Sequence, residues 1–511
     1  MSKILRIDLF IAISILLLVW PGVFPSFANF LFGVALFYFF FRYVIVLLMN
    51  KDITIMYKDY LISRYNVFLI IHGFIFLMLS AYIDFDYLGR TEGDWITYDF
   101  NARNYAEHLF KDSTYKFSNP FVNINDGGAY LDVMTASGYM TMIGLIYYFF
   151  NFSTSLAVLI NVFFIVSTSI VLYMLLHNIF NHRIAKYAMY MSAFFPVFFL
   201  LELSLWKECI VLFLFVTVSL LTYRILYNKR TIFDIILLVI FSYTLLNVRF
   251  YYLLPIVTLF ISYYLAINPS FKKFGLVILI IGLIGFYFIE VIGFSGTNVL
   301  YKAFYKGFSV VDVQMDINYS FKLSDPLQII WLAFKYPSRY LFQLPNYLSS
   351  PWSLPRIYHI PFLSKTKIWS TEYWPYELLN YSSGVFLWIN IFAGLFGFMN
   401  MFKNNIKKTA IIWVPLLLLP IVSTFMGGSG RYLEGLTPFV LGTIAIGLAN
   451  KNRAKSYFVA AYVLSLSLIV IVNRNSFIFP TVIFSLGIMG IIYLYKNLIH
   501  PKIRMLNIMK G

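Results

Sequence analysis

Long apolar runs recur along almost the whole chain, and they constrain its fold more than any other feature. About fourteen of them are long enough to cross a bilayer, which takes roughly 20 apolar residues as an α-helix. Hydrophobic residues make up 60% of the 511 residues and charged residues only 12%, which excludes a water-soluble globule. We therefore predict an all-α, polytopic integral membrane protein, because helices satisfy their own backbone hydrogen bonds in lipid.

The apolar runs predict a single polytopic transmembrane domain over residues 1–511, with long outer-face loops at 84–154 and 293–383. The first run has a basic flank, and no small-residue cleavage site follows it, so we expect an uncleaved signal anchor. The predicted spans are 8–23, 28–48, 66–83, 155–177, 187–204, 209–226, 231–248, 250–267, 274–292, 384–402, 409–426, 433–449, 456–472 and 477–495.

Lysine and arginine are distributed unevenly among the loops, and this asymmetry orients the predicted helices. With the N-terminus inside, the short outer connections carry only Lys207, Arg249, Arg431 and Arg474. The cytoplasmic connections carry Lys51, Lys58, Arg64, Arg183, Lys186, Arg224, Lys229, Arg230, Lys272, Lys273, Lys403, Lys407, Lys408, Lys451, Arg453 and Lys455. Such loops face the anionic leaflet, which explains the net charge of +17. We expect a membrane-lipid partner and no nucleic acid.

One apolar stretch, residues 134–150, does not fit this alternation. If it spanned the membrane, every later loop would change sides and the basic loops would lie outside. We therefore predict a re-entrant or interfacial helix on the outer surface, with an ordinary span as the alternative. The second long loop contains a semi-apolar segment broken at Pro337, which is also predicted to be interfacial.

A carboxylate follows the third predicted span at the start of the first long loop. In a helix, the i, i+4 spacing places Asp94, Tyr98 and Ala102 on one face and turns Asp99 away from it. A carboxylate at this point could accept the proton of an attacking hydroxyl group. The alternative is that Asp94 is a solvated loop residue.

Charged residues also stand at three predicted outer turns. Lys207 and Glu208 lie between two apolar runs, Arg249 lies at a second turn, and Arg431 and Glu434 lie at a third. Charges near bilayer depth tend to be paired or functional, and guanidinium matches phosphate oxygens bidentately. The predicted convergence of three cations on one face indicates a phosphate site. Hydrated turns or lipid-headgroup contacts are the alternatives.

Several other chemistries lack their sequence motifs. The chain has no GxxxxGK[ST], GxSxG, HExxH or CxxC sequence, and its six histidines are not at metal-ligand spacing. His72 lies inside a predicted span, where we expect a packed core residue. The single cysteine, Cys209, excludes an internal disulfide.

These residues resemble the GT-C superfamily of polytopic glycosyltransferases, which use polyprenyl-phosphate-linked sugars. Asp94 with Tyr98 and Ala102 is similar to the family's D-x3-Y-x3-A pattern. Residues 177–213 resemble its basic turn, proline-bearing helix and charged outer turn, and NVRFYYLLP and GSGRYLEGLTPFVLGTIAIGL resemble its arginine-led final spans. Two spans precede the catalytic loop's own span where the family usually has one, and the C-terminal soluble domain of several members is missing.

The resemblance implies an inverting transfer, with Asp94 as catalytic base. It implies substrate-binding roles for Tyr98, Lys207, Glu208, Arg249 and Arg431. The implied partners are a polyprenyl-phosphate-sugar donor and a lipid-linked or cell-envelope glycan or glycolipid acceptor. Phosphate is a good leaving group, so no cofactor is required, although Asp94 and Glu208 could hold a divalent metal. We expect a multi-pass protein of the bacterial cytoplasmic membrane with its active site on the outer, periplasmic or extracellular, face.

Two other functions remain open on the sequence. A Wzy-type polysaccharide (O-antigen) polymerase would depend on Arg249 and Arg431 and would not need Asp94. A flippase or other transporter of lipid-linked glycans would need paired charges within its helices, which the sequence mostly lacks.

Overall fold

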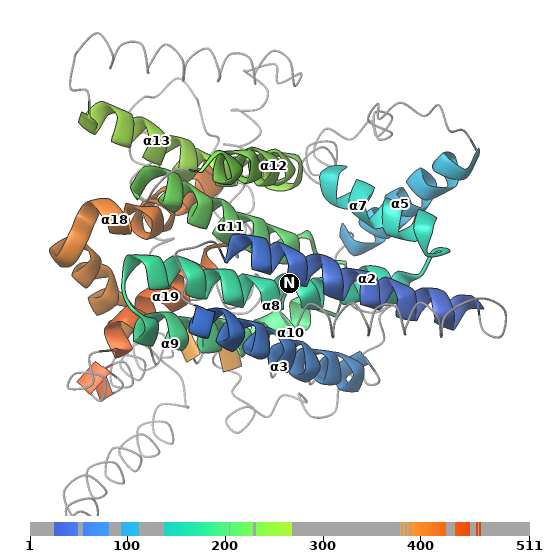
Figure 1. Ribbon diagram of the computed structural model, residues 1–511, viewed down its shortest axis with the longest axis horizontal. Helices are drawn as coiled ribbons and strands as arrows, with labels where there is room; N and C mark the ends of the chain where they lie inside the picture. The colour runs from blue at the N-terminus through green and yellow to red at the C-terminus, as the bar shows by residue number, and fades with distance from the viewer. Residues whose placement is uncertain are drawn as a thin grey trace, which may run out of the picture.

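The computed structural model is built from helices, and every regular element among the residues it describes is helical (Figure 1). The described residues are 25–49, 55–80, 94–111, 137–203, 205–227, 231–267, 379, 382–383, 386–387, 390–425, 435–449, 456–457 and 459–460. The predictions for 8–23, 274–292, 477–495 and most of 293–383 and 456–472 lie outside them. The helical architecture expected from the apolar runs is confirmed for the described part of the chain.

The helices are, in chain order, α2 (Pro25–Leu48), α3 (Ile55–Ser80), α5 (Asp94–Lys111), α7 (Ser137–Phe149), α8 (Thr154–Ile179), α9 (His182–Ala193), α10 (Pro196–Leu201), α11 (Lys207–Tyr227), α12 (Ile232–Arg249), the 3-10 turn η1 (Phe250–Tyr252), α13 (Leu253–Ile267), α18 (Ile391–Phe425) and α19 (Thr437–Leu448). Among the described residues, 5 helices are long and apolar enough to cross a membrane, lying within α2, α3, α8, α11 and α12.

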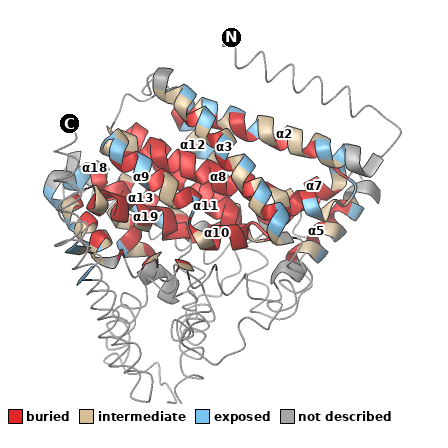
Figure 2. Ribbon diagram, turned by 90° about the horizontal axis from the view of Figure 1, so that it is seen from below, coloured by how far each residue is buried: buried red, intermediate tan, exposed pale blue. Residues whose placement is uncertain are grey.

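The centre of the bundle is formed by α8 and α11. Both are apolar around their whole circumference, and such a helix is stable only when neighbours cover it. The most apolar window of α11 is 100% buried and that of α8 is 89% buried, whereas the windows of α2, α3 and α12 are only 22% to 33% buried. These three helices therefore present apolar side chains outward around a closed core, as expected for helices that face lipid (Figure 2).

The long helices alternate in direction, so each end of the bundle gathers particular connections. At one end, the Arg224 end, Arg224 of α11 donates a hydrogen bond to the Leu48 carbonyl, which closes α2, at 2.5 Å, and pairs with Asp234 of α12 at 3.7 Å. Tyr227 also donates to the Lys407 carbonyl at 2.5 Å. The basic connections near Lys58, Lys186, Arg224 and Lys407 thus share one end, as the charge alternation predicts.

The helix α18 folds back on itself where two spans, 384–402 and 409–426, were predicted. The Thr409 hydroxyl donates a hydrogen bond to the Met401 carbonyl at 3.1 Å, and the Trp413 indole donates to the Ile406 carbonyl at 3.0 Å. In a straight helix, residues eight positions apart are separated by about 12 Å along the axis. The chain therefore bends sharply near Lys403–Lys408, so α18 has two arms.

The first arm of α18 packs against α19 through glycines. A side chain at Gly397 would meet the Thr443 carbonyl of α19, and one at Gly447 would meet the Ala393 carbonyl of α18. Small residues of this kind let two apolar helices approach closely, a common device in membrane bundles. The described part of α19, at 12 residues, is shorter than the predicted span 433–449.

The described part of the apolar stretch 134–150 contains α7, which has 13 residues. A helix of this length extends about 20 Å and does not reach across a hydrocarbon core of about 30 Å. It packs on α5 at the edge of the molecule opposite α18 (Figure 1), and at Gly144 an added side chain would meet Tyr105 and the Ala102 carbonyl. The re-entrant or interfacial placement of this stretch stays a prediction.

Two predicted spans need correction. The span predicted at 66–83 belongs to α3, which already begins at Ile55. The hydropathy pattern missed the first turns of this helix because they contain Lys58 and Arg64. The span predicted at 187–204 is two helices: α9 ends at Ala193 and α10 begins at Pro196. Proline has no backbone N–H and its ring clashes with the carbonyl of the preceding turn, so it ends the first helix.

Candidate functional site

At the end of the bundle opposite Arg224, which we call the Lys207 end, charged and aromatic side chains from five elements meet. The structure brings together four of the residues predicted to bind substrate: Tyr98 of α5, Lys207 and Glu208 of α11, and Arg249 of α12. All four are buried, with exposed fractions of 2% to 3%. The adjoining tyrosines are Tyr139 of α7 and Tyr251 and Tyr252 of η1.

Lys207 lies over an aromatic platform. Its Nζ atom is 5.4 Å from the centre of the Tyr98 ring, a cation–π distance, and that ring packs edge-on against Tyr139 with the ring centres 5.5 Å apart. Burial raises the pKa of Tyr139, whose side chain is fully enclosed. Tyr139 therefore stays a neutral phenol, and the electron-rich face of the Tyr98 ring favours a cation.

Arg249 is held by two partners. One terminal nitrogen forms an ion pair with Glu208 Oε1, and the other, Nη1, donates a hydrogen bond to the Tyr251 hydroxyl at 2.6 Å. Because Glu208 is in the first turn of α11 and Arg249 is in the last turn of α12, both charges also suit the dipoles of their helices. The planar guanidinium is consequently fixed in one orientation.

The segment at Gly435 is a sixth part of the cluster, and it is reached through Tyr252 of η1. The turn η1 places Tyr252 against Phe215 of α11, and the Gly435 backbone N–H donates a hydrogen bond to the Tyr252 hydroxyl at 3.0 Å. A side chain at Gly435 would collide with the Tyr252 ring, so glycine is required for this approach. Arg431, predicted to bind phosphate, lies outside the described residues and is not placed by the structure.

The described part of the cluster brings two cations and one carboxylate together in a place that excludes water. Lys207, Arg249 and Glu208 are each nearly inaccessible to solvent. In such surroundings charge interactions are far stronger than in water, and a buried ion is stable only with well-placed partners. The described part of the cluster therefore holds Lys207 and Arg249 in fixed places beside Glu208 and the tyrosines.

The structure separates the two aspartates of the first long loop. Tyr98 and Ala102 are buried on one face of α5, as the i, i+4 spacing predicts. Asp94 is the first residue of α5, and its side chain lies outside the described part of the structure. Asp99 points elsewhere: Tyr147 of α7 donates a hydrogen bond to it, and Arg103 pairs with it at 2.8 Å.

Asp99 belongs to an anchor between helices. Arg103 also donates to the Thr154 hydroxyl at the start of α8, at 2.8 Å, so this network joins α5, α7 and α8. The hydrogen bond to Asp99 raises the pKa of Arg103, and burial together with the same carboxylate raises the pKa of Tyr147. These interactions give Asp99 a structural role, which the sequence pattern did not reveal.

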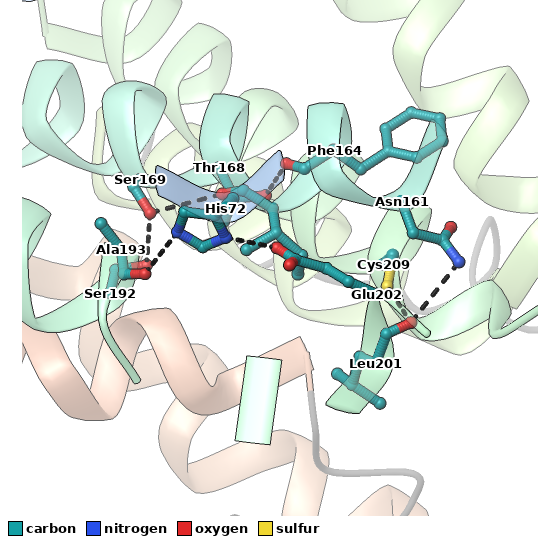
Figure 3. Close-up of polar contacts among 11 residues, drawn as sticks. His72, Asn161, Phe164, Thr168, Ser169, Ser192, Ala193, Leu201, Glu202 and Cys209 are labelled. Carbon is teal, nitrogen blue, oxygen red and sulfur yellow. Dashed lines mark hydrogen bonds and ion pairs between the residues drawn. The ribbon is translucent and has the colours of Figure 1, made fainter. Parts of the chain in front are cut away.

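A third buried pair of ionisable side chains joins α3 to the end of α10 (Figure 3). His72 Nδ1 is 2.6 Å from Glu202 Oε1, and His72 Nε2 is 2.7 Å from the Ala193 carbonyl. His72 is a packed core residue, as predicted, but both of its nitrogens are engaged. Its depth in a predicted span and the nearby Pro196 were the sequence signals that could have indicated a pair.

Fold and cluster together define a helical protein with candidate membrane spans and a buried cluster of charged and aromatic side chains at one end of its bundle. Compared with known proteins, the chain matches no family model, and none of the curated proteins is significantly similar to it. Within the described residues, His, Cys, Asp and Glu form no group of three that could hold a metal ion.

Proposed function

We propose that this protein is a membrane glycosyltransferase that moves a sugar from a polyprenyl-phosphate carrier to a lipid-linked or cell-envelope glycan acceptor. The observation that carries the proposal is the convergence of Lys207, Glu208, Arg249 and Tyr98, from three separate helices, into one buried cluster that holds two cations. A lipid phosphate entering from the bilayer carries the opposite charge. The GT-C resemblance supports the sugar as the group transferred and the outer face of a bacterial cytoplasmic membrane as the location.

In the proposed reaction, an acceptor hydroxyl oxygen attacks the anomeric carbon of the donor sugar. The bond between that carbon and the phosphate oxygen breaks, and its electron pair leaves with the phosphate. Asp94 accepts the hydroxyl proton. Lys207 and Arg249 stabilise the charge that develops on the departing phosphate, and they are effective because their partners fix them before the substrate arrives. Attack from the opposite face inverts the anomeric centre.

The proposed chemistry requires no metal. Phosphate is a good leaving group, and in the described residues Glu208 already pairs with Arg249 through Oε1. We therefore assign no step to a metal ion.

The test is sugar transfer by the purified, detergent-solubilised protein from a polyprenyl-monophosphate sugar to glycolipid acceptors. The proposal expects transfer that Arg249→Lys weakens strongly and that Glu107→Gln leaves unchanged, because Glu107 is an exposed carboxylate on α5 away from the cluster. Wild-type transfer rates in Arg249→Lys would contradict a role for the cluster in catalysis.

A polysaccharide polymerase is the second candidate, and the buried pairing of Arg249 favours it as much as it favours the transferase. Such an enzyme uses lipid diphosphates and would not need Asp94. Activity with a lipid-diphosphate glycan but not with the monophosphate sugar, retained in Asp94→Asn, would select the polymerase.

A transporter of lipid-linked glycans is the candidate from another class, and one observation favours it. The His72–Glu202 pair lies beside the interruption between α9 and α10, and ionisable pairs at broken helices are typical of transporters. Movement of a lipid-linked glycan across reconstituted vesicles, without formation of a new glycosidic bond, would select this function.

A further inference from the structure

The interruption between α9 and α10 leaves two backbone groups without their helical partners. If the helix continued, the Ala193 carbonyl would accept a hydrogen bond from the Val197 N–H. Instead, His72 Nε2 is 2.7 Å from the Ala193 carbonyl, and the Val197 N–H donates to the Ser383 hydroxyl at 2.7 Å. The side chains of His72 and Ser383 therefore satisfy both backbone groups, so the helix break is stabilised by specific hydrogen bonds.

The proton count of the His72–Glu202 pair follows from this geometry. A carbonyl oxygen only accepts hydrogen bonds, so the His72 Nε2 atom facing Ala193 carries a hydrogen. The 2.6 Å contact between Nδ1 and Glu202 Oε1 then holds one further proton, which belongs either to the imidazole or to the carboxyl group. Either arrangement makes the pair neutral overall. The pair can thus stay buried, with exposed fractions of 0% and 1%, while still bonding strongly.

The pair fixes the beginning of the turn that leads into the candidate site. Glu202 directly follows α10, and Lys207 and Glu208 begin α11. The neighbouring Leu201 carbonyl accepts hydrogen bonds from the Asn161 amide at 3.5 Å and from the Cys209 thiol at 3.3 Å (Figure 3). The short turn is therefore held at its start by α3 and α8 and at its end by α11.

We propose that His72 and Glu202 are positioning residues, which hold this turn so that Lys207 and Glu208 stand in the anion site. This inference rests on the proposed function for the role of Lys207, but the mechanical part does not depend on it. Glu202 Oε2 has no hydrogen-bond partner among the described residues, so His72 is the ionic partner on which the placement of this carboxylate depends. Loss of His72 is expected to release the turn.

The labelling rate of Cys209, the single cysteine of the chain, measures how readily the turn opens. Cys209 is fully buried, adjoins Glu208 and bonds to the Leu201 carbonyl. In detergent-solubilised wild-type protein, we expect slow reaction of this thiol with N-ethylmaleimide, because the turn must open first. In His72→Leu, we expect the reaction to be faster by about tenfold or more, the change that loss of a charged hydrogen bond predicts. Glu202→Gln, which can donate its amide N–H to His72 Nδ1, is expected to react at nearly the wild-type rate.

A matched control is available at the other end of α11. Asp234→Asn removes the charge of another buried carboxylate, which pairs with Arg224, about 26 Å along the helix from Lys207. We expect Asp234→Asn to leave the labelling of Cys209 unchanged. Faster labelling in Asp234→Asn as well would show general loosening of the bundle and would overturn the proposal.

A kinetic readout separates positioning from folding. For His72→Leu, we expect the KM for the polyprenyl-phosphate donor to rise about tenfold with a smaller change in kcat, because misplaced cations weaken phosphate binding. If this variant does not fold, His72→Leu with Glu202→Leu removes the unpaired buried charge and is measured in the same two ways.

The possible results are distinct. Wild-type labelling of a folded His72→Leu or double variant, or labelling of Glu202→Gln as fast as that of His72→Leu, overturns the positioning role. If His72→Leu is labelled faster but the wild-type protein transfers no sugar from any donor, the positioning role is supported. The proposed function is then rejected.

Discussion

The helices α11 and α12 are joined by a buried ion pair at each of their ends, and the two pairs differ in their surroundings. At the Arg224 end, Arg224 and Asp234 have opposite charges that cancel, Arg224 also donates to the Leu48 carbonyl, and Asp234 accepts from Thr231. At the Lys207 end, the pair of Glu208 and Arg249 lies beside a second cation, Lys207. The side chains of Tyr98 and Tyr251 contact these two cations.

The described contacts at the two ends therefore differ in kind. The Arg224 contacts tie the ends of α2, α11 and α12 together. The Lys207 cluster gathers two cations and several tyrosines in a water-poor place, and it is the end to which we assign the proposed function. Substitutions at the two ends are therefore expected to affect different properties of the protein.

The largest expected effect is on catalysis at the Lys207 end. The proposed mechanism makes Asp94 the general base. In Asp94→Asn, a nearly isosteric amide that does not accept a proton at neutral pH takes its place, so the transfer rate should fall by about 10²–10⁴. Glu107→Gln on the same helix is the control, since Glu107 is exposed. Asp99 is a poor control because it anchors three helices. Full activity of Asp94→Asn, with loss in Arg249→Lys, would favour the polymerase.

The next effect is on stability at the Arg224 end. Asp234→Ala leaves Arg224 buried without its ionic partner, which should lower the free energy of unfolding by about 3–5 kcal/mol. Sugar transfer per folded molecule should stay the same, because this end is far from the proposed site. Thermal unfolding in detergent and transfer assays on the monodisperse fraction measure the two quantities. A variant of normal stability that fails to transfer sugar would reverse the roles given to the two ends.

The sequence predicted the composition of the Lys207 cluster better than it predicted the helices around it. Lys207, Glu208 and Arg249 could be found because charges between apolar runs are costly and because alternating basic loops place them on one side. Tyr98 was found from its i, i+4 spacing to Asp94. The break at Pro196 was missed, since hydropathy averaged over a window does not register a single proline. The partners of Arg249 were also missed, because contacts between distant helices depend on packing that no local pattern records.

A smaller effect is expected from changing the shape of one cation. Arg249→Lys keeps the charge but cannot bond Glu208 and Tyr251 in the same planar geometry. Loss of one hydrogen bond to a charged group, about 1.5–3 kcal/mol, corresponds to a fall in kcat/KM of roughly 10-fold to 150-fold. Arg431→Lys is predicted to fall similarly. Arg224→Lys, made at the other end, should lower the unfolding temperature and leave kcat/KM unchanged.

The smallest effect concerns the aromatic platform under Lys207. Tyr98→Leu keeps an apolar side chain but removes the ring 5.4 Å from the lysine, and a cation–π contact is worth about 0.5–2 kcal/mol. Phosphate binding should therefore weaken by roughly 2-fold to 30-fold, seen as a higher KM for the donor. Tyr98→Phe retains the ring and should lose less than Tyr98→Leu, which separates the role of the ring from that of the hydroxyl. If Tyr98→Phe is the weaker of the two, the hydroxyl group contacts the substrate and the platform does not act through its ring. If both match the wild type while Arg249→Lys is impaired, Arg249 and not Lys207 is the cation that binds the phosphate.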